Sequence, residues 1–246
     1  MSAPGRLIAS CALLLLCLAG PLNLRAQVLV WSTGNSLGGT QSVANYLTAS
    51  GYFSSVTAFD GTRVLSDLTP YQAILFFTNS NSSTDPVAIG NTLAAYANSG
   101  RGLVLATFAW ANQGTNTLGG DIITQGLSPF VLNGTSLYTN VTMASNNGSG
   151  LFNGVTSLNG YYHDAVTLTS GSTLLASWSD GRPLEAQRGN IIGINLFPDA
   201  TPGSLSGNYQ ALFSNAVLKV IPEPATSALF GAGLAVLGLR RWRRRR

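Results

Sequence analysis

Cysteine is scarce in this 246-residue sequence: there are two, Cys11 and Cys17, and both lie in the first 26 residues. Those residues have the features of a removable leader, so the remaining chain would have no thiol. It could form no disulfide, use no thiolate nucleophile and offer no soft metal ligand. Its stability must come from a hydrophobic core, and residues 27–220 are numerous enough to build one.

Charged residues are also scarce, at 9% of the chain against about a quarter in ordinary globular proteins. The formal net charge of +4 comes from the two ends, which hold Arg6, Arg25, Arg240, Arg241, Arg243, Arg244, Arg245 and Arg246. Between them, eight acidic residues face five basic ones, so residues 27–220 carry a net charge of about −3. The positive net charge therefore does not indicate a nucleic-acid partner.

Histidine occurs once, as His163, and is followed by Asp164. A single histidine cannot form the histidine-rich clusters that are typical of transition-metal sites. We therefore expect no metal site and no cofactor, and we expect His163 to lie in a loop or at the surface.

The first 26 residues have the features of a secretory signal peptide. Arg6 supplies the positive start, residues 7–19 are apolar, and Leu24-Arg25-Ala26 offers a small residue before a cut at Gln27. Ala26 and Gln27 thus flank the predicted cleavage site. Two alternatives stay open: a lipoprotein signal at Ile8-Ala9-Ser10-Cys11, which comes early in the apolar run, and a retained membrane anchor.

The last 26 residues, 221–246, combine three features. Pro222, Glu223 and Pro224 form a segment that cannot be helical and stays extended and accessible. Residues 225–239 are apolar and span about 22 Å as a helix, against ~30 Å for the hydrocarbon core, a gap that bilayer thinning can close. Residues 240–246 are rich in arginine, which holds this end in the cytoplasm. The sequence therefore predicts one C-terminal transmembrane helix, with residues 27–220 outside the inner membrane.

This order of features resembles the PEP-CTERM sorting signal of Gram-negative bacteria. The resemblance implies export, transient anchoring in the inner membrane with the domain in the periplasm, and cleavage by an exosortase near Pro222, Glu223 and Pro224. The product would then reach the cell surface or the extracellular space. In that family such proteins accompany exopolysaccharide production and biofilm formation. The implied partners are therefore the export machinery, an exosortase and exopolysaccharide. A plain tail anchor and a nucleic-acid-binding arm are the alternatives, and an exported body meets no nucleic acid.

Residues 27–220 show the alternation of apolar strands and helices that is typical of one α/β domain. Strands are predicted at 27–32, 53–59, 71–78 and 102–108, with helices at 40–50 and from Asp85 to the residue before Gly100. The strands are almost continuously apolar, which indicates burial on both faces. The predicted fold class is α/β, with a doubly wound, mainly parallel sheet.

The second half of the domain has a weaker pattern. Residues 111–160 are rich in Asn, Gly, Ser and Thr, and 138–143 could form an edge strand. Two strand-like runs lie within 166–178, a clear strand at 190–196, and a last helix at 208–220.

The order of these elements resembles the class I glutamine amidotransferase-like, or flavodoxin-like, fold. The local matches are the segments 150–155, 175–181 and 193–199. In active members of that family the last segment carries a histidine and an acid that serve a cysteine nucleophile, and here those positions are Phe197 and Asp199. The nucleophile turn matches 107–110, which contains neither Cys nor Ser. The resemblance therefore implies a non-catalytic relative, because acyl transfer needs a nucleophile and a base.

A ligand crevice is expected at the carboxyl ends of the parallel strands. Amide, hydroxyl and aromatic side chains gather in the loops there, and the candidate residues are Asn35, Asn79, Trp110, Asn112, Phe197 and Asp199. Such groups suit uncharged, hydroxyl-rich ligands such as glycans, although polar loops also serve solubility alone. The loop 34–40 resembles a phosphate loop but lacks its lysine, so we interpret it as a tight turn.

The alternative function is a polysaccharide or ester hydrolase that uses loop aspartates, namely Asp60, Asp121 or Asp199. Asp60 and Asp67 could in principle form the carboxylate pair of a glycoside hydrolase. Two acids near loops among eight are expected by chance, so this pattern alone does not favour catalysis.

Overall fold

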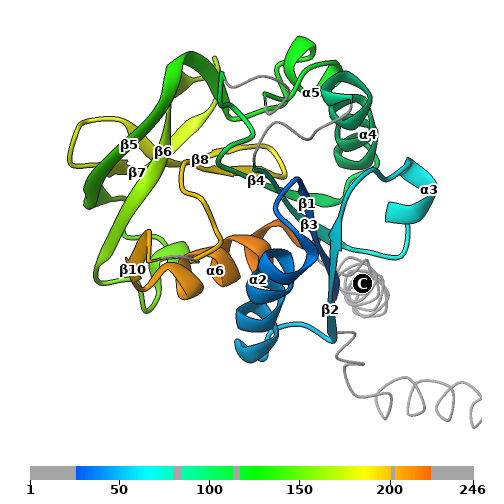
Figure 1. Cartoon of the computed structure of the whole chain (residues 1–246), viewed down its shortest axis with the longest axis horizontal. Coiled ribbons are helices and arrows are strands. Elements are labelled where there is room, and N and C mark those ends of the chain that lie inside the picture. The colour runs from blue at the N-terminus through cyan, green and yellow to red at the C-terminus, as the bar shows by residue number, and fades with distance from the viewer. Residues whose placement is uncertain (1–25, 80–84, 113–116, 201–202, 223–246) are drawn as a thin grey trace, which may run out of the picture.

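A computed structural model describes residues 26–79, 85–112, 117–200 and 203–222. They form one sheet of ten strands in the order β10-β6-β5-β7-β8-β9-β4-β3-β1-β2, covered by helices on both faces (Figure 1). The predicted α/β class is confirmed. The sheet is mixed, since one half is parallel and the other half antiparallel.

The parallel half contains the strongly apolar strands. It consists of β1 (Gln27–Thr33), β2 (Ser55–Asp60), β3 (Ala73–Thr78), β4 (Gly102–Ala106) and β9 (Ile191–Ile194). Every residue of β3, β4 and β9 is buried, as is β1 after its first residue. This burial explains why these strands have no polar side, because helices cover both faces.

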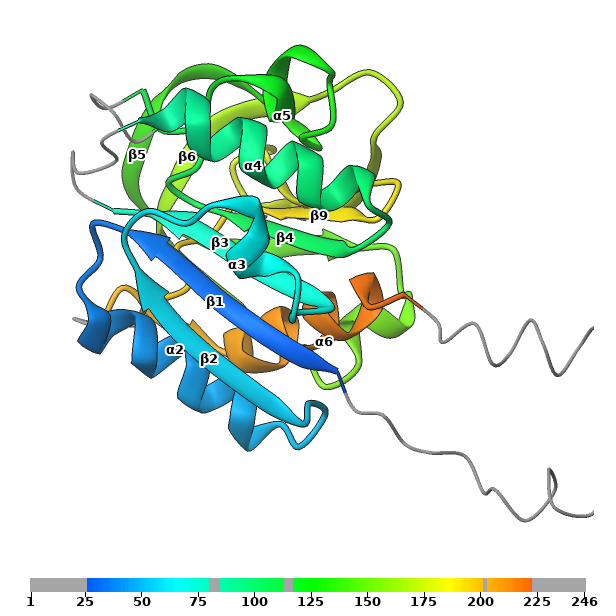
Figure 2. The same cartoon turned by 90° about the vertical axis from the view of Figure 1, so that its right-hand side faces the viewer.

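Helices cover the two faces of the parallel half separately (Figure 2). One face is covered by α2 (Leu37–Ala49) and α6 (Tyr209–Val220), and the other by α4 (Pro86–Asn98) with the short α3 (Leu65–Leu68) and α5 (Asp121–Thr124). Asp85 begins α4 by accepting hydrogen bonds from two backbone N–H groups, and Gly100 follows its end with φ of +85°. Helix α2 begins earlier than predicted, since its N-cap is Ser36 and not Thr40.

The antiparallel half was predicted less well. It contains β5 (Phe130–Asn146), β6 (Leu158–Leu168), β7 (Thr173–Trp178), β8 (Pro183–Arg188) and β10 (Leu205–Gly207), with the 3₁₀ turn η1 at Gly150–Phe152. The predicted edge strand 138–143 instead lies inside β5, between β6 and β7. β5 is long and polar, and its pairing with β6 shifts register twice, so no regular alternation appears in its sequence.

His163 is a correction to the sequence prediction, because it lies in β6 and is fully buried. Its Nε2 atom is 3.1 Å from Asp180 Oδ2, and Arg182 Nη1 donates to the same oxygen at 2.7 Å. Burial lowers the pKa of His163, although the bond to Asp180 opposes that shift. The imidazole is therefore a structural group that packs 6.2 Å from the ring of Trp178.

The two halves of the sheet are joined by the pairing of β8 with β9, and the fully buried side chain of Asn195, directly after β9, adds hydrogen bonds across this junction. Its Oδ1 accepts from Thr107 Oγ1 at 3.1 Å and from the N–H of Asp164 at 2.7 Å. Its Nδ2 donates to the carbonyls of Asp164 and Pro183 at 2.9 and 3.0 Å. One amide thus bonds with the end of β4, the middle of β6 and the first residue of β8.

The ends of the domain sit beside the predicted processing sites. Ala26 is buried and its carbonyl accepts from the N–H of Ser54, while Gln27 begins β1. Helix α6 ends at Val220, and the backbone of Ile221 is extended. Within 26–222, where the structure describes the chain, no helix is long and apolar enough to cross a membrane. The predicted membrane helix, 225–239, and the arginine cluster lie outside the described residues.

Candidate functional site

Three of the predicted crevice residues meet in one open pocket of about 370 Å³. Asn35 follows β1, Asn79 follows β3, and Asp199 follows β9. These strands are parallel, so their carboxyl ends reach the same edge of the sheet. The rest of the lining comes from the start of α2, at Ser36, Gly38 and Gly39.

Hydrogen bonds connect the three polar side chains. Asn79 Nδ2 donates to Asn35 Oδ1 at 2.9 Å, and Asn35 Nδ2 donates to Asp199 Oδ2 at 3.2 Å. Asp60 Oδ1 accepts from the N–H of Asn35 at 3.3 Å and from Ser32 Oγ at 2.8 Å, which ties the loop after β1 to the end of β2. The pocket therefore has both donors and acceptors, held in place from three strands.

The pocket is poorly suited to a phosphate. It lies at the N-terminus of α2, where an anion would ordinarily be favoured. Asp199 lines the pocket beside this N-terminus, where its Oδ2 accepts from Asn35 Nδ2, and Ser36 Oγ accepts from the N–H of Gly39. A second anion would be repelled, which agrees with the interpretation of 34–40 as a tight turn.

Gly39 allows α2 to approach the pocket closely. A Cβ at this position would overlap Asp199 Oδ2 and lie 2.6 Å from Asn35 Nδ2, whereas a Cβ at Gly38 would meet no described atom within 4 Å. We expect Gly39→Ala to separate the Asn35–Asp199 pair and to lower the free energy of unfolding by about 1–3 kcal/mol. Gly38→Ala should be neutral or slightly stabilising, since alanine is the better helix former. Urea unfolding of both variants checks this, and equal losses would contradict it.

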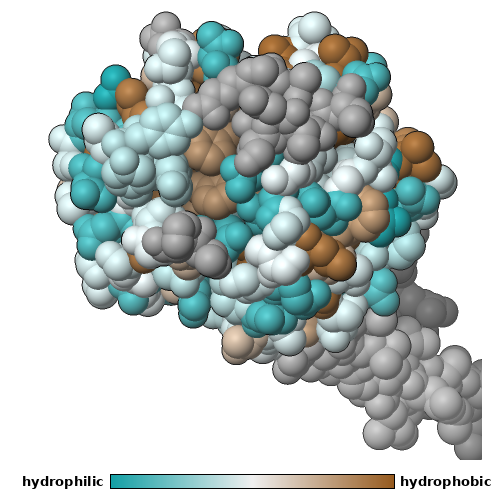
Figure 3. Space-filling model, viewed as in Figure 1, coloured by the Kyte–Doolittle hydropathy of each residue, from teal (hydrophilic) through white to brown (hydrophobic). Residues whose placement is uncertain are grey.

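The positions that match the nucleophile turn and the base hold packed phenylalanines. Phe108 and Phe197 are 5% and 4% exposed, with ring centroids 5.3 Å apart. Phe197 also packs against Phe77 at 5.6 Å. Figure 3, which looks onto this end of the sheet, shows an apolar patch in the middle of a mostly hydrophilic face. Neither phenyl ring can accept or deliver a proton.

Trp110 and Asn112 do not line this pocket. Trp110 is 1% exposed and belongs to the core on the α4 side of the sheet, where its Nε1 donates to Ser128 Oγ at 2.9 Å. Its ring packs against Phe130 at 5.0 Å. Asn112 is exposed. The sequence placed Trp110 after a strand but could not tell which face of the sheet its ring would enter.

Of the acidic residues considered for hydrolysis, Asp60 and Asp199 both bond with Asn35, the first with its backbone N–H and the second with its side chain. Asp67 instead accepts from the N–H of Val64 at the start of α3, and its Oδ2 lies 3.9 Å from Arg63 Nη1. Asp121 is exposed in the first turn of α5. Among the described residues, no three His, Cys, Asp or Glu side chains gather as a metal-binding group.

Two buried acids outside the pocket have strongly shifted pKa values. Burial raises the pKa of Glu185, in β8, to about 8, and neither of its oxygens has a hydrogen-bond partner within the described parts of the chain. Burial also raises the pKa of Asp164 to about 7, although a hydrogen bond from Ser136 Oγ at 2.7 Å opposes the shift. Sequence patterns did not indicate either group, because burial of a single acid leaves no periodic signal.

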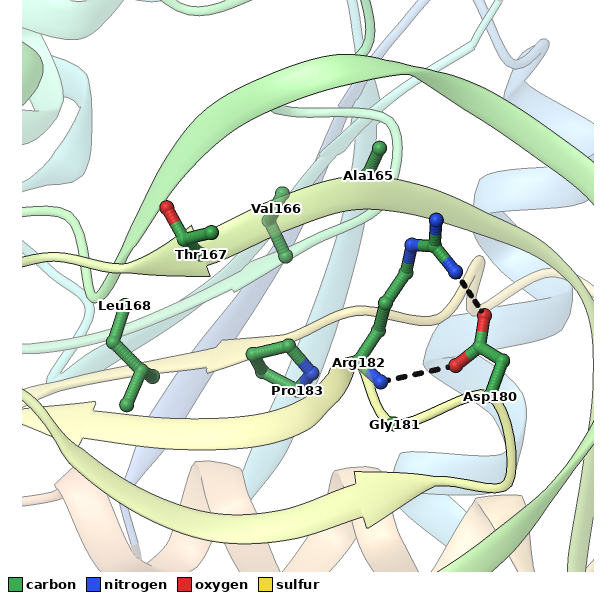
Figure 4. A pocket seen from close by; sticks show the side chains of 8 residues that line it. All are labelled: Ala165, Val166, Thr167, Leu168, Asp180, Gly181, Arg182 and Pro183. Atoms are coloured by element: carbon green, nitrogen blue, oxygen red, sulfur yellow. Dashed lines mark hydrogen bonds and ion pairs between the residues drawn. The ribbon is translucent and has the colours of Figure 1, made fainter.

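A second open pocket, of about 520 Å³, lies between β6 and the β7–β8 turn (Figure 4). Residues 165–168 form one wall and residues 180–183 the other. Figure 4 shows the side chain of Arg182 reaching toward Asp180, its partner in the ion pair. Of the residues that the structure describes, only this pair and Thr167 bring polar side chains to the lining, so this pocket offers less chemistry than the first.

Comparison with known proteins identifies the tail and the fold. The model of the PEP-CTERM protein-sorting motif matches residues 220–245. This motif implies that the protein is exported and processed at the membrane by an exosortase. No curated protein sequence matches the chain.

Solved structures with similar folds are glutamine amidotransferase-like. A crystal structure of a GMP synthase component from Thermoplasma acidophilum matches with a TM-score of 0.55 at 10% identity, covering 85% of this chain and 98% of that one. A glutamine amidotransferase from Thermotoga maritima matches with a TM-score of 0.49 at 9% identity, covering 70% and 76%. At such identities the first likeness establishes the fold alone.

Proposed function

We propose that this exported, exosortase-processed protein presents a non-catalytic α/β domain at the cell surface or in the extracellular matrix. The domain binds a neutral, hydroxyl-rich ligand, of which the glycans of an exopolysaccharide or biofilm are the candidate class. The pocket of Asn35, Asn79 and Asp199 is the binding site.

One observation carries this proposal: the amide and carboxylate pocket lies beside Phe197 and Phe108, at the positions where the resemblance to the amidotransferase-like fold implies the base and the nucleophile turn. Phe197 stands two residues before Asp199 and packs on Phe108. A sugar hydroxyl both donates and accepts hydrogen bonds, so it can bond with an amide N–H and a carboxylate at once. The phenylalanine rings, which are almost fully buried, pack beside the pocket and transfer no proton. Binding without turnover is the chemistry that these groups support.

Removing polar groups from the pocket should weaken binding. We expect Asp199→Asn and Asn35→Ala each to weaken saccharide binding by at least about tenfold, because the first replaces an acceptor oxygen by a donor N–H and the second removes the amide that bonds with Asn79 and Asp199. Asn112→Ala, at an exposed position outside the pocket, should bind like wild type. A glycan array followed by calorimetry measures these affinities. Unchanged binding by the Asp199→Asn variant would refute the assignment of this pocket as the binding site.

Turnover is the competing outcome. If the purified protein hydrolyses polysaccharides or esters, and Asp→Asn at position 60, 121 or 199 abolishes that activity, the domain is a hydrolase. The proposal expects no hydrolysis of these substrates or of glutamine by wild type.

Sorting has its own test. Mass spectrometry of the released protein should find a C-terminus near Pro222, Glu223 and Pro224, and an N-terminus near Gln27. Replacing Pro222, Glu223 and Pro224 by alanine should leave the intact chain in the membrane fraction. An intact C-terminus on the released wild-type protein would refute this part of the proposal.

A further inference from the structure

Three tyrosines from β5 and β6 form a continuous aromatic surface, here called the tyrosine shelf: Tyr138, Tyr161 and Tyr162. Tyr138 pairs across the strands with Tyr162, and their ring centroids are 5.6 Å apart. Tyr161 lies 5.0 Å from Tyr162 and 6.4 Å from Tyr138. Tyr138 is 45% exposed, and the other two are half-buried.

The shelf depends on an irregularity in the sheet. Adjacent residues of a strand normally point to opposite faces, yet the rings of Tyr161 and Tyr162 touch edge to face. The pairing of β5 with β6 shifts register between Tyr138 and Val141, directly beside them. Such shifts re-aim side chains, and they are common next to functional sites.

The shelf is connected to the pocket through the packed phenylalanines. The ring centroid of Tyr162 lies 5.7 Å from that of Phe108 and 6.0 Å from that of Phe197. Asp199, in the wall of the pocket, follows Phe197 by two residues. The polar pocket, the buried phenylalanines and the tyrosine shelf therefore follow one another through these contacts, and together they are here called the strip.

The chemistry of this strip selects its ligand. A sugar ring has an apolar face of C–H groups and a polar rim of hydroxyls, and tyrosine offers a large, rigid ring with a polar tip. Among the described residues, no cation lines the pocket or belongs to the shelf, while Asp199 is an anion. A neutral chain fits this strip better than an acidic polymer or a nucleic acid.

We infer that Tyr138, Tyr161 and Tyr162 form a second subsite, so that the domain binds an extended neutral glycan and not a single sugar. One unit bonds with Asn35, Asn79 and Asp199 in the pocket, and later units stack on the tyrosine shelf. This inference rests on the proposed function of the pocket.

The test compares chain lengths. The full chain, purified in a mild detergent, is titrated with neutral hexasaccharides of glucose, mannose, galactose and N-acetylglucosamine, and with the matching monosaccharides. At least one hexasaccharide should bind at least about tenfold more tightly than its monosaccharide, which corresponds to about 1.4 kcal/mol.

Variants then locate the gain. Tyr138→Ala and Tyr161→Ala should each lose most of the hexasaccharide advantage while leaving monosaccharide binding unchanged, and Tyr138→Phe should retain it because the ring remains. Tyr52→Ala is the matched control, since Tyr52 is 44% exposed and packs on Phe53 instead. If both alanine variants keep the advantage while Asp199→Asn loses binding, the shelf is refuted and the pocket stands. If no saccharide binds at millimolar concentration, the pocket and the shelf are both refuted.

Discussion

At about pH 9, the variant Glu185→Gln is expected to unfold roughly 10 °C above the wild-type protein, whereas near pH 4.5 the two midpoints should coincide. Glu185 is fully buried in β8 between Ala176 of β7 and Ile194 of β9. Both carboxyl oxygens lack a hydrogen-bond partner among the described residues, and burial raises the pKa to about 8. Glutamine has nearly the same shape as the protonated acid but cannot ionise.

The sign of the effect follows from proton binding. In the unfolded chain Glu185 loses its proton near pH 4.5, whereas in the folded protein it keeps the proton until about pH 8. Between those values the folded state binds more protons, so wild-type stability falls as pH rises and levels off above pH 8. The loss amounts to roughly 3–5 kcal/mol, or about 10 °C for a domain of this size.

Thermal unfolding followed by circular dichroism gives the difference in midpoint temperature between the variant and the wild type at each pH. His163 and Asp164 titrate in both proteins, so their contributions cancel in the difference. Asn112→Ala, an exposed substitution that changes no titratable group, serves as the control and should differ from wild type by a constant amount across this pH range. A constant difference between Glu185→Gln and wild type from about pH 4.5 to 9 would show that Glu185 is not held protonated by the fold.

The second large effect is expected for Asn195→Ala, which should lower the free energy of unfolding by about 3–5 kcal/mol. The substitution removes at once four hydrogen bonds that Asn195 makes with groups of Thr107, Asp164 and Pro183. Unsatisfied buried polar groups each cost about 1–3 kcal/mol, and partial relaxation reduces the sum.

Urea unfolding measures this loss, with Asn112→Ala as the matched control at an exposed position. The control should lie within about 0.5 kcal/mol of wild type. A loss below about 1 kcal/mol for Asn195→Ala would mean that the two halves of the sheet are held together by strand pairing alone.

The parallel half could be predicted because its signal is local. Strands such as Ala73–Thr78 and Gly102–Ala106 are buried on both faces, so nearly every residue is apolar, and Asp85-Pro86 marks the start of α4 by its own chemistry. The pocket followed from the same logic, since Asn35 and Asn79 come directly after parallel strands that end at one edge.

The antiparallel half was predicted only in part, because its signal is not local. β8 contains Pro, Glu, Gln and Arg, and its sequence looks polar, yet it lies inside the sheet between β7 and β9, and Glu185 is fully buried. The tyrosine shelf depends on a register shift between distant strands, which the isolated sequence of either strand does not reveal. The prediction that Trp110 lines the crevice was wrong for a related reason, because the side chain of a turn residue can pack on either face of the sheet.

By itself, the sequence determined where the positive charges lie, that residues 27–220 contain no thiol, and that the tail carries a sorting motif. These are properties of continuous segments of the sequence, which do not depend on how the chain folds. The tertiary structure alone decided that Phe108 and Phe197 pack together, that Glu185 and His163 are buried, and that three tyrosines of β5 and β6 meet. Each of these depends on contacts between residues far apart in the chain, and their energies come from packing and desolvation that no local pattern records.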